Sequence, residues 1–287
     1  MDEANAERKL AVGQFAEKEP VVAEAAGKEA PLSNRVSLRG DRTHNVLNLD
    51  LAELARAGVI IPDDKRSKIK EEYKHIKRPL LQKASIDAPV EKHENLIMLT
   101  SAHSGEGKTF SSLNLAMSIA VERDRRVLLI DADVVKPGLG RMLGLQEKPG
   151  LVEYLNGDKK DLSEILLSTN VHNLTLMPAG KTHHLTHELL ASKTMAELVD
   201  ELSSRYRDRV VIFDSPPLLA TSESKVLSRL VGQIVLVIEQ DKTSQSAVQD
   251  ALAAVEREKV SGLILNKSRA GRESYYGYYY SDSADEK

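Results

Sequence analysis

The chain has 287 residues and a net charge of −3 at pH 7, from 40 Lys and Arg against 43 Asp and Glu. This length accommodates one substantial α/β domain with extensions. The nearly balanced charge excludes an extended positively charged surface of the kind that binds nucleic acid. The sequence has no cysteine, which excludes disulfides and thiol chemistry, and its longest apolar runs are too short to span a membrane. We therefore expect a protein of the cytoplasm.

The N-terminal part of the chain divides into two expected segments. Residues 1–44 are rich in Ala, Glu and Lys with little hydrophobic periodicity, which is typical of a disordered segment. Residues 45–94 read as a helical extension, because leucine spacing predicts a helix over 47–57 and a second helix from Ser67. The second helix should end or kink at Pro79, since proline removes a helical hydrogen bond.

The main domain is expected at 95–270, where aliphatic and β-branched runs alternate with helical stretches. This alternation predicts a mostly parallel twisted sheet with right-handed crossovers and helices on both faces. The predicted strands are 96–100, 127–131, 173–177, 209–214, 234–239 and 261–266. The predicted helices are 108–121, 139–145, 150–156, 161–168, 187–204, 222–231 and 243–258.

A glycine-rich loop from Ala102 to Thr109 follows the first of these strands. Backbone N–H groups of such a loop turn inward around nucleotide phosphates, while its lysine reaches the outer phosphates and its threonine hydroxyl ligates Mg²⁺. The strict pattern has glycine where Ala102 stands, so the strand before the loop and the helix after it are needed for the prediction. The expected nucleotide-binding residues of the loop are Ser104, Gly105, Glu106, Gly107, Lys108, Thr109 and Phe110.

Aspartates follow two of the predicted strands: Asp131 and Asp133 end one, and Asp214 ends another. Because the carboxyl ends of parallel strands meet at one edge of a sheet, these side chains should lie beside the glycine-rich loop. An aspartate there can hold Mg²⁺, whereas the alternative is an aspartate that only caps the next helix. The loop in the same chain favours a Mg²⁺-nucleotide site, with Thr109, Asp131 and Asp214 at the metal and Lys108, Asp131, Asp133 and Asp214 in catalysis.

Residues 271–287 form a tail of different composition. Five of the eight tyrosines of the chain fall between 275 and 280, flanked by glycine, serine and acidic residues. A sticky low-complexity tail is one interpretation, and a stacking surface for single-stranded nucleic acid is another, which the acidic neighbours disfavour. In the third interpretation the tail is flexible and brings its tyrosine hydroxyls to a Mg²⁺-nucleotide site, where they would be phosphorylated. The expected phosphoacceptors are Tyr275, Tyr276, Tyr278, Tyr279 and Tyr280, with no nucleic-acid partner.

Taken in order, these motifs resemble those of the bacterial tyrosine kinases, and most closely the autokinases of exopolysaccharide loci of the exosortase/PEP-CTERM type. The resemblance runs from about residue 46 to the tail and includes Glu71–Leu81, Ser104–Thr109, Asp214–Leu219 and Leu265–Lys267. It implies a P-loop NTPase fold of the MinD/ParA-like branch, with ATP and Mg²⁺ as cofactors. It further implies that Asn266 recognises the adenine base of ATP.

The resemblance also implies a homo-oligomeric ring in which the tail of one subunit enters the active site of its neighbour. The oligomerisation motif of the family, Glu-x-x-Arg-x-x-Arg, corresponds here to Glu71, Lys74 and Lys77. Both arginines are replaced by lysines, which lack the bidentate fork of arginine. The implied partner is a separate membrane-embedded activator, or chain-length determinant, which would hold this chain at the inner face of the inner membrane.

The resulting hypothesis is an ATP-dependent protein-tyrosine autokinase that phosphorylates its tail in trans and regulates exopolysaccharide synthesis and export. A tyrosine hydroxyl with a pKa of about 10 is a poor nucleophile, so Asp131 would orient or deprotonate it. One alternative is a MinD/ParA-type ATPase, whose signature lysine would stand at the place of His103. The other is a non-catalytic, nucleotide-gated adaptor of the secretion machinery, because Val135 stands where the family usually has arginine.

Overall fold

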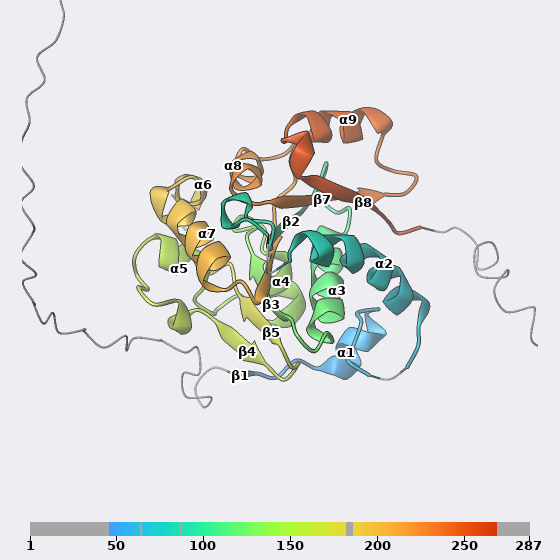
Figure 1. The fold of residues 1–287 in the computed structure, drawn as a ribbon, viewed down its shortest axis with the longest axis horizontal. Helices are drawn as coiled ribbons and strands as arrows, with labels where there is room; N and C mark the ends of the chain where they lie inside the picture. Colours follow the sequence, from blue (N-terminus) through green and yellow to red (C-terminus); the bar gives the residue numbers. More distant parts are fainter. Residues whose placement is uncertain (1–45, 64, 86–87, 182–185, 269–287) are drawn as a thin grey trace, which may run out of the picture. The chain divides into compact units, whose positions relative to one another are not determined.

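The computed structural model describes residues 46–63, 65–85, 88–181 and 186–268, which contain an eight-stranded sheet (Figure 1). The strands are β1 Val46–Leu47, β2 Leu96–Ser101, β3 Arg126–Asp131, β4 Leu167–Thr169, β5 Leu174–Met177, β6 Arg209–Asp214, β7 Gln233–Glu239 and β8 Val260–Asn266. Their order is β1-β4-β5-β3-β6-β2-β7-β8, and β4 and β5 form its antiparallel pair. The predicted mostly parallel sheet is confirmed.

Helices cover both faces of this sheet (Figure 1). They are α1 Leu51–Arg56, α2 Lys68–Lys83, α3 Lys108–Ala120, α4 Gly138–Leu143, α5 Leu151–Leu155, α6 Thr186–Leu190, α7 Lys193–Arg205, α8 Glu223–Leu230 and α9 Gln245–Ala253. Single 3₁₀ turns occur at Val90–Lys92, Leu162–Glu164 and Arg257–Lys259. None of these helices is both long and apolar enough to cross a membrane.

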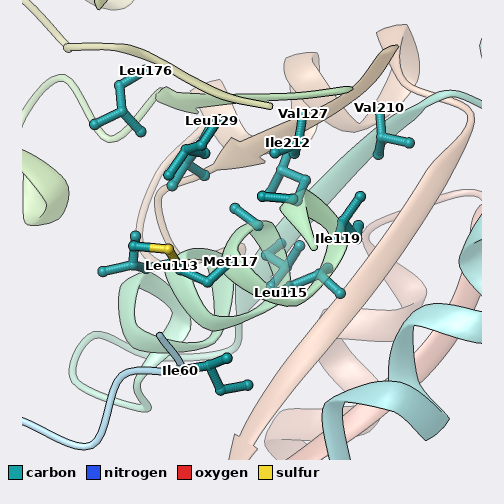
Figure 2. Close-up of a cluster of buried hydrophobic side chains, with 14 of the residues drawn as sticks. Ile60, Leu113, Leu115, Met117, Ile119, Val127, Leu129, Leu176, Val210 and Ile212 are labelled. Carbon is teal, nitrogen blue, oxygen red and sulfur yellow. The ribbon is translucent and has the colours of Figure 1, made fainter. Parts of the chain in front are cut away.

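Side-chain alternation along the strands separates two hydrophobic cores. In β3, Val127 and Leu129 join the core that α1, α2 and α3 cover, whereas Leu128 and Ile130 join the core beneath α5, α7, α8 and α9. Figure 2 shows the first core, where Leu113 and Met117 of α3 lie below Leu129. The central strands are buried on both faces, which is why their sequences are continuous apolar runs.

The six predicted strands are confirmed to within one residue at each end, but four helix predictions are wrong in part. The segment 161–168 holds one 3₁₀ turn and then β4, which pairs with β5. The segment 187–204 is divided into α6 and α7, because the Ser192 hydroxyl accepts the Met195 N–H and starts a new helix. The helix predicted at 243–258 ends at Ala253, and the one predicted at 47–57 starts only at Leu51.

The second N-terminal helix, α2, continues past Pro79 to Lys83, so it does not end at the proline; the alternative, a kink there, stays a prediction. Tertiary contacts on the buried side of α2 stabilise the turn after the proline. Leu80 is 2% exposed, and its carbonyl accepts a hydrogen bond from Gln233 Nε2 at 3.0 Å. Burial of this kind compensates for the one helical hydrogen bond that proline removes.

Candidate nucleotide-binding and active site

The glycine-rich loop connects the end of β2 to the start of α3, as predicted. Gly105 and Gly107 have φ angles of +89° and +93°, in the left-handed region that favours glycine. Alternation of such residues with ordinary ones forms a nest of inward-facing N–H groups, which binds anions. The nest lies at the N-terminus of α3, whose dipole also favours negative charge. This loop has the geometry of a phosphate-binding site.

Two aspartates lie side by side where β3 and β6 end. Asp131 pairs in register with Asp214, and both side chains are fully buried. Asp131 Oδ2 accepts the Gly140 N–H at 3.1 Å, and Asp214 Oδ1 accepts the Ser112 hydroxyl at 3.2 Å. Their other oxygens, Asp131 Oδ1 and Asp214 Oδ2, have no hydrogen-bond partner within the described residues. Two buried carboxylates with free oxygens form a site that suits a hard cation.

The environment of these carboxylates disfavours their charged forms. Burial, with the neighbouring Asp214 as a second cause, raises the pKa of Asp131 to about 8. Burial likewise raises the pKa of Asp214 to about 6. A cation between them would reverse this effect, because it favours ionised ligands.

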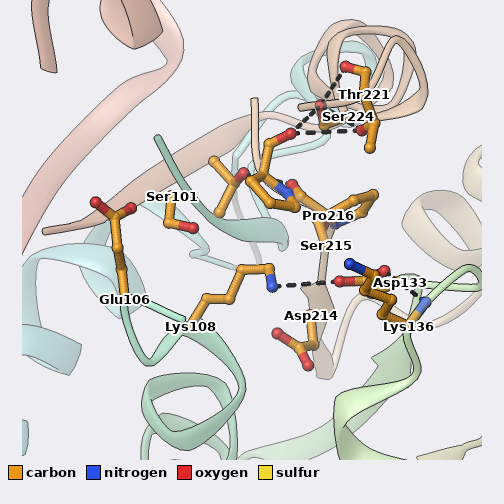
Figure 3. A network of polar contacts seen from close by, with 12 residues as sticks. Ser101, Glu106, Lys108, Asp133, Lys136, Asp214, Ser215, Pro216, Thr221 and Ser224 are labelled. Carbon is orange, nitrogen blue, oxygen red and sulfur yellow. Dashed lines mark hydrogen bonds and ion pairs between the residues drawn. The ribbon is translucent and has the colours of Figure 1, made fainter. Parts of the chain in front are cut away.

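Lys108 lies opposite these carboxylates and pairs with the third predicted aspartate (Figure 3). Its Nζ is 3.2 Å from Asp133 Oδ2, and both side chains are less than a tenth exposed. Asp133 Oδ1 also accepts the Lys136 N–H at 3.1 Å. Thr109 lies beside Asp214, since its side chain hydrogen-bonds the Asp214 carboxyl and acts to lower the pKa of that group against the effect of burial. The structure therefore brings all the predicted catalytic and metal-binding residues to one edge of the sheet.

Three other predicted nucleotide-binding residues lie at different places around the loop. Ser104 is exposed at the loop, whereas the Phe110 ring turns toward the first core, where a Cβ at Gly58 would be 3.8 Å from it. Asn266 lies behind the loop, and its Nδ2 donates to the Glu106 carbonyl at 2.9 Å. Thr243 and Lys267 also contact the loop, and neither is among the predicted site residues.

The predicted oligomerisation residues lie on α2, away from this edge. Glu71 and Lys74 form an exposed pair, with Oε1 and Nζ 2.7 Å apart. Lys77 is 7% exposed and holds α2 on α3, because its Nζ donates to the Ser118 carbonyl at 2.6 Å and pairs with Glu122. The carbonyl belongs to the last turn of α3, where a cation is favourable. Lys77 thus stabilises the packing of α2 on α3 within one subunit, whatever contacts it makes in an oligomer.

We expect Lys77→Met to lower the free energy of unfolding by about 2 kcal/mol, since it leaves a buried helix-end carbonyl without its donor. Lys74→Met is the matched control from the same motif. This substitution should leave the free energy of unfolding nearly unchanged, because the exposed pair with Glu71 is solvated. Urea denaturation of both variants measures the difference, and equal effects would contradict the internal role of Lys77.

Several predictions concern residues outside the part of the chain that the structure describes. These are the disordered segment at 1–44 and the phosphoacceptor tyrosines at 275–280. Within the described ranges, no cluster of three or more His, Asp or Glu side chains forms a metal site by itself.

Comparison with known proteins identifies the family. Residues 94–265 match the family model described as an AAA domain. The chain is 34% identical over 224 residues to tyrosine-protein kinase YwqD of Bacillus subtilis, a match that covers 77% of this chain and 90% of YwqD. It is 31% identical over 252 residues to the succinoglycan biosynthesis transport protein ExoP of Rhizobium meliloti, covering 82% of this chain and 31% of ExoP.

Solved structures agree with these sequence matches. The kinase domain of Escherichia coli tyrosine kinase ETK has a TM-score of 0.62 at 26% identity, covering 81% of this chain and 94% of that domain. The cell division ATPase MinD of Pyrococcus furiosus has a TM-score of 0.50 at 20% identity, covering 62% of this chain and 73% of MinD, and so shares the fold. The chain therefore belongs to the bacterial tyrosine-protein kinases, which have a nucleotide-binding P-loop fold.

Proposed function

We propose that this kinase uses ATP and Mg²⁺ to phosphorylate its own tyrosine cluster at 275–280. The observation that carries the proposal is the convergence of Lys108, Asp131 and Asp214 beside a backbone nest for phosphate. The same arrangement would serve a MinD/ParA-type ATPase. Membership of the tyrosine-kinase family and the tyrosine-rich tail favour the kinase.

The residues at the sheet edge fit a magnesium ion and a triphosphate. Asp131 and Asp214 each offer a free carboxylate oxygen, and Thr109 offers its hydroxyl nearby. Bound Mg²⁺ would neutralise charge on the transferring phosphoryl group. Lys108, which pairs with Asp133, is long enough to donate instead to the outer phosphate. Positioning and charge neutralisation of this kind account for most of the catalysis in phosphoryl transfer.

Asp131 is the proposed base. Burial raises the pKa of the Asp131 carboxyl when no cation is present, and bound Mg²⁺ would keep it ionised, so that it could accept the proton of the phenol. Its Oδ2 is fixed by the Gly140 N–H, which leaves Oδ1 for the incoming phenol hydroxyl or the metal. The tyrosine oxygen would attack the γ-phosphorus, and its proton would pass to Asp131 as ADP leaves.

We further propose that transfer occurs in trans within a homo-oligomer and that the kinase regulates exopolysaccharide synthesis and export. The named role of the relative ExoP in succinoglycan biosynthesis and transport supports this setting. A separate membrane-embedded activator would bring the chain to the inner face of the membrane. Glu71 and Lys74 are exposed on α2 and are available for subunit contacts.

A mixing experiment tests transfer in trans. The enzyme is the full chain with Tyr275, Tyr276, Tyr278, Tyr279 and Tyr280 replaced by Phe, and the acceptor is the full chain carrying Lys108→Met. With Mg·ATP, we expect phosphotyrosine in the tail of the acceptor, and none when either protein is incubated alone. Wild-type protein that labels itself while this mixture stays unlabelled would show that transfer occurs within one chain.

A further inference from the structure

Glu106 places a carboxylate inside a loop whose predicted ligand is a polyanion, and the structure shows how the charge is kept away. The side chain is 3% exposed and points away from Lys108 and Asp214 (Figure 3). Its Oε2 accepts the His103 N–H at 2.9 Å, and its Oε1 accepts the Thr243 hydroxyl. The carboxylate therefore ties the start of the loop to its middle and both to the segment before α9.

Two further hydrogen bonds reach the outer side of the loop from the end of β8. Asn266 Nδ2 donates to the Glu106 carbonyl at 2.9 Å, and Lys267 Nζ donates to the Gly105 carbonyl at 2.7 Å. Lys267 is itself held by Glu239 of β7, with Nζ and Oε2 2.9 Å apart. Consecutive carbonyls of the loop are thus bound by two consecutive side chains from the end of β8.

These carbonyl contacts have a consequence for the N–H groups. A trans peptide unit is planar, and its C=O and N–H point in opposite directions. The Gly105 carbonyl shares a unit with the Glu106 N–H, and the Glu106 carbonyl shares one with the Gly107 N–H. When both carbonyls are held outward, both N–H groups are directed inward, toward the place of the phosphates. Donors oriented in advance need no reorganisation when an anion binds.

We propose that Glu106, Thr243 and Lys267 form a loop latch that positions these N–H groups for nucleotide binding. They are positioning residues, since they act through the backbone of the loop and through each other. The inference rests on the proposed nucleotide site, but the latch itself is a property of the loop and can be measured without nucleotide. It also explains how a carboxylate is accommodated in a phosphate-binding loop.

Lys267→Met is the most discriminating variant, because the chain supplies a matched control. Lys242 also pairs with Glu239, at 2.9 Å, but makes no hydrogen bond to the loop. We expect Lys267→Met to raise the Kd for ADP about tenfold and to lower the NMR order parameters of the loop amides from about 0.85 to below about 0.6. Lys242→Met should change neither quantity, since it removes only an ion pair with 73% of the lysine side chain exposed.

The Glu106 contact is tested by a double-mutant cycle. Glu106→Ala should raise the Kd for ADP about thirtyfold, whereas Glu106→Gln, which keeps an acceptor for the His103 N–H, should restore most of the affinity. Thr243→Val should weaken binding about fivefold in the wild-type background and much less in Glu106→Ala, where only the hydrogen bond from the Glu239 N–H to the Thr243 hydroxyl is left to lose. Additive effects would contradict direct coupling between Glu106 and Thr243.

NMR order parameters of the loop amides, measured on the full chain without nucleotide, separate the latch from the proposed function. Lower order confined to the loop in Lys267→Met and Glu106→Ala supports the latch even if the wild-type protein binds no nucleotide. Wild-type order parameters in both variants would overturn the latch even if ADP binds tightly. If Glu106→Ala fails to fold, Thr243→Val and Lys267→Met against Lys242→Met decide the question.

Discussion

Replacing Asp131 with asparagine is expected to lower the rate of tyrosine phosphorylation about a thousandfold, within the range found for loss of a general base. The amide retains an oxygen for the Gly140 N–H, so the fold around α4 should be kept. It removes the negative charge that the proposed base and metal ligand require. Retention of full phosphorylation by Asp131→Asn would contradict the role of this residue.

The same substitution should stabilise the protein, and the gain should depend on pH. The pKa of Asp131 is raised from 3.8 to about 8, so the folded state binds a proton more tightly than the unfolded state. Wild-type stability therefore falls as the pH rises from about 4 to about 8, because the unfolded state ionises over this range while the folded state keeps its proton. Asparagine does not titrate, so the gain in the free energy of unfolding on substitution should be larger at pH 8 than at pH 5.

Urea denaturation at the two pH values measures this effect. Asp250→Asn is the control, because Asp250 is exposed on α9 and its side chain makes no hydrogen bond or ion pair among the described residues. Its substitution should leave the pH dependence of stability unchanged. A variant Asp131→Asn that is less stable than wild type at pH 8 would show that the Asp131 charge is compensated in the folded protein.

Gly107→Ala is expected to weaken nucleotide binding about a hundredfold, the size of effect that a misplaced binding group produces. A Cβ at this position would lie 2.0 Å from Asn266 Nδ2, and the residue has a φ of +93°. The loop must therefore shift or lose its hydrogen bond from Asn266, and in either case its N–H groups lose their orientation. Isothermal titration with ADP measures the loss.

Gly144→Ala separates the effect on the loop from simple backbone strain. Gly144 ends α4 with a φ of +68°, and an added Cβ there meets no atom within 4 Å. This variant should lose about 1 kcal/mol of stability from the left-handed conformation and bind ADP normally. Equal losses of affinity in the two glycine variants would show that the contact between Gly107 and Asn266 has no special role.

The sheet and the centre of the site could be predicted because their signals are local. Aliphatic runs such as 127–130 are buried on both faces, and residues at the carboxyl ends of neighbouring parallel strands must meet, as Asp131 and Asp214 do. The short β4 could not be predicted, because it has three residues and its pairing with β5 stabilises it. The continuation of α2 past Pro79 could not be predicted for a similar reason. The turn after the proline is stabilised by a hydrogen bond to the Leu80 carbonyl from Gln233, which is distant in the sequence.

The contacts behind the phosphate loop also lie beyond local sequence signals. Thr243 is 137 residues from Glu106, and Lys267 is 162 residues from Gly105. No spacing rule connects them, and only the adjacency of β7 and β8 to the loop brings them together. From the sequence alone, the negative charge of Glu106 beside phosphates is unfavourable. The structure explains it, because the carboxylate is hydrogen-bonded to the His103 N–H and the Thr243 hydroxyl.

Phosphotyrosine mapping by mass spectrometry tests the central claim most directly. Purified protein is incubated with Mg·ATP beside a Lys108→Met control, which lacks the cation nearest the proposed phosphate site. We predict phosphate on tyrosines within 275–280 of the wild-type protein and none on the control. Phosphate on both proteins would show that the activity lies elsewhere. A wild-type tail that stays unmodified while the protein binds ATP would contradict the assignment as a tail autokinase.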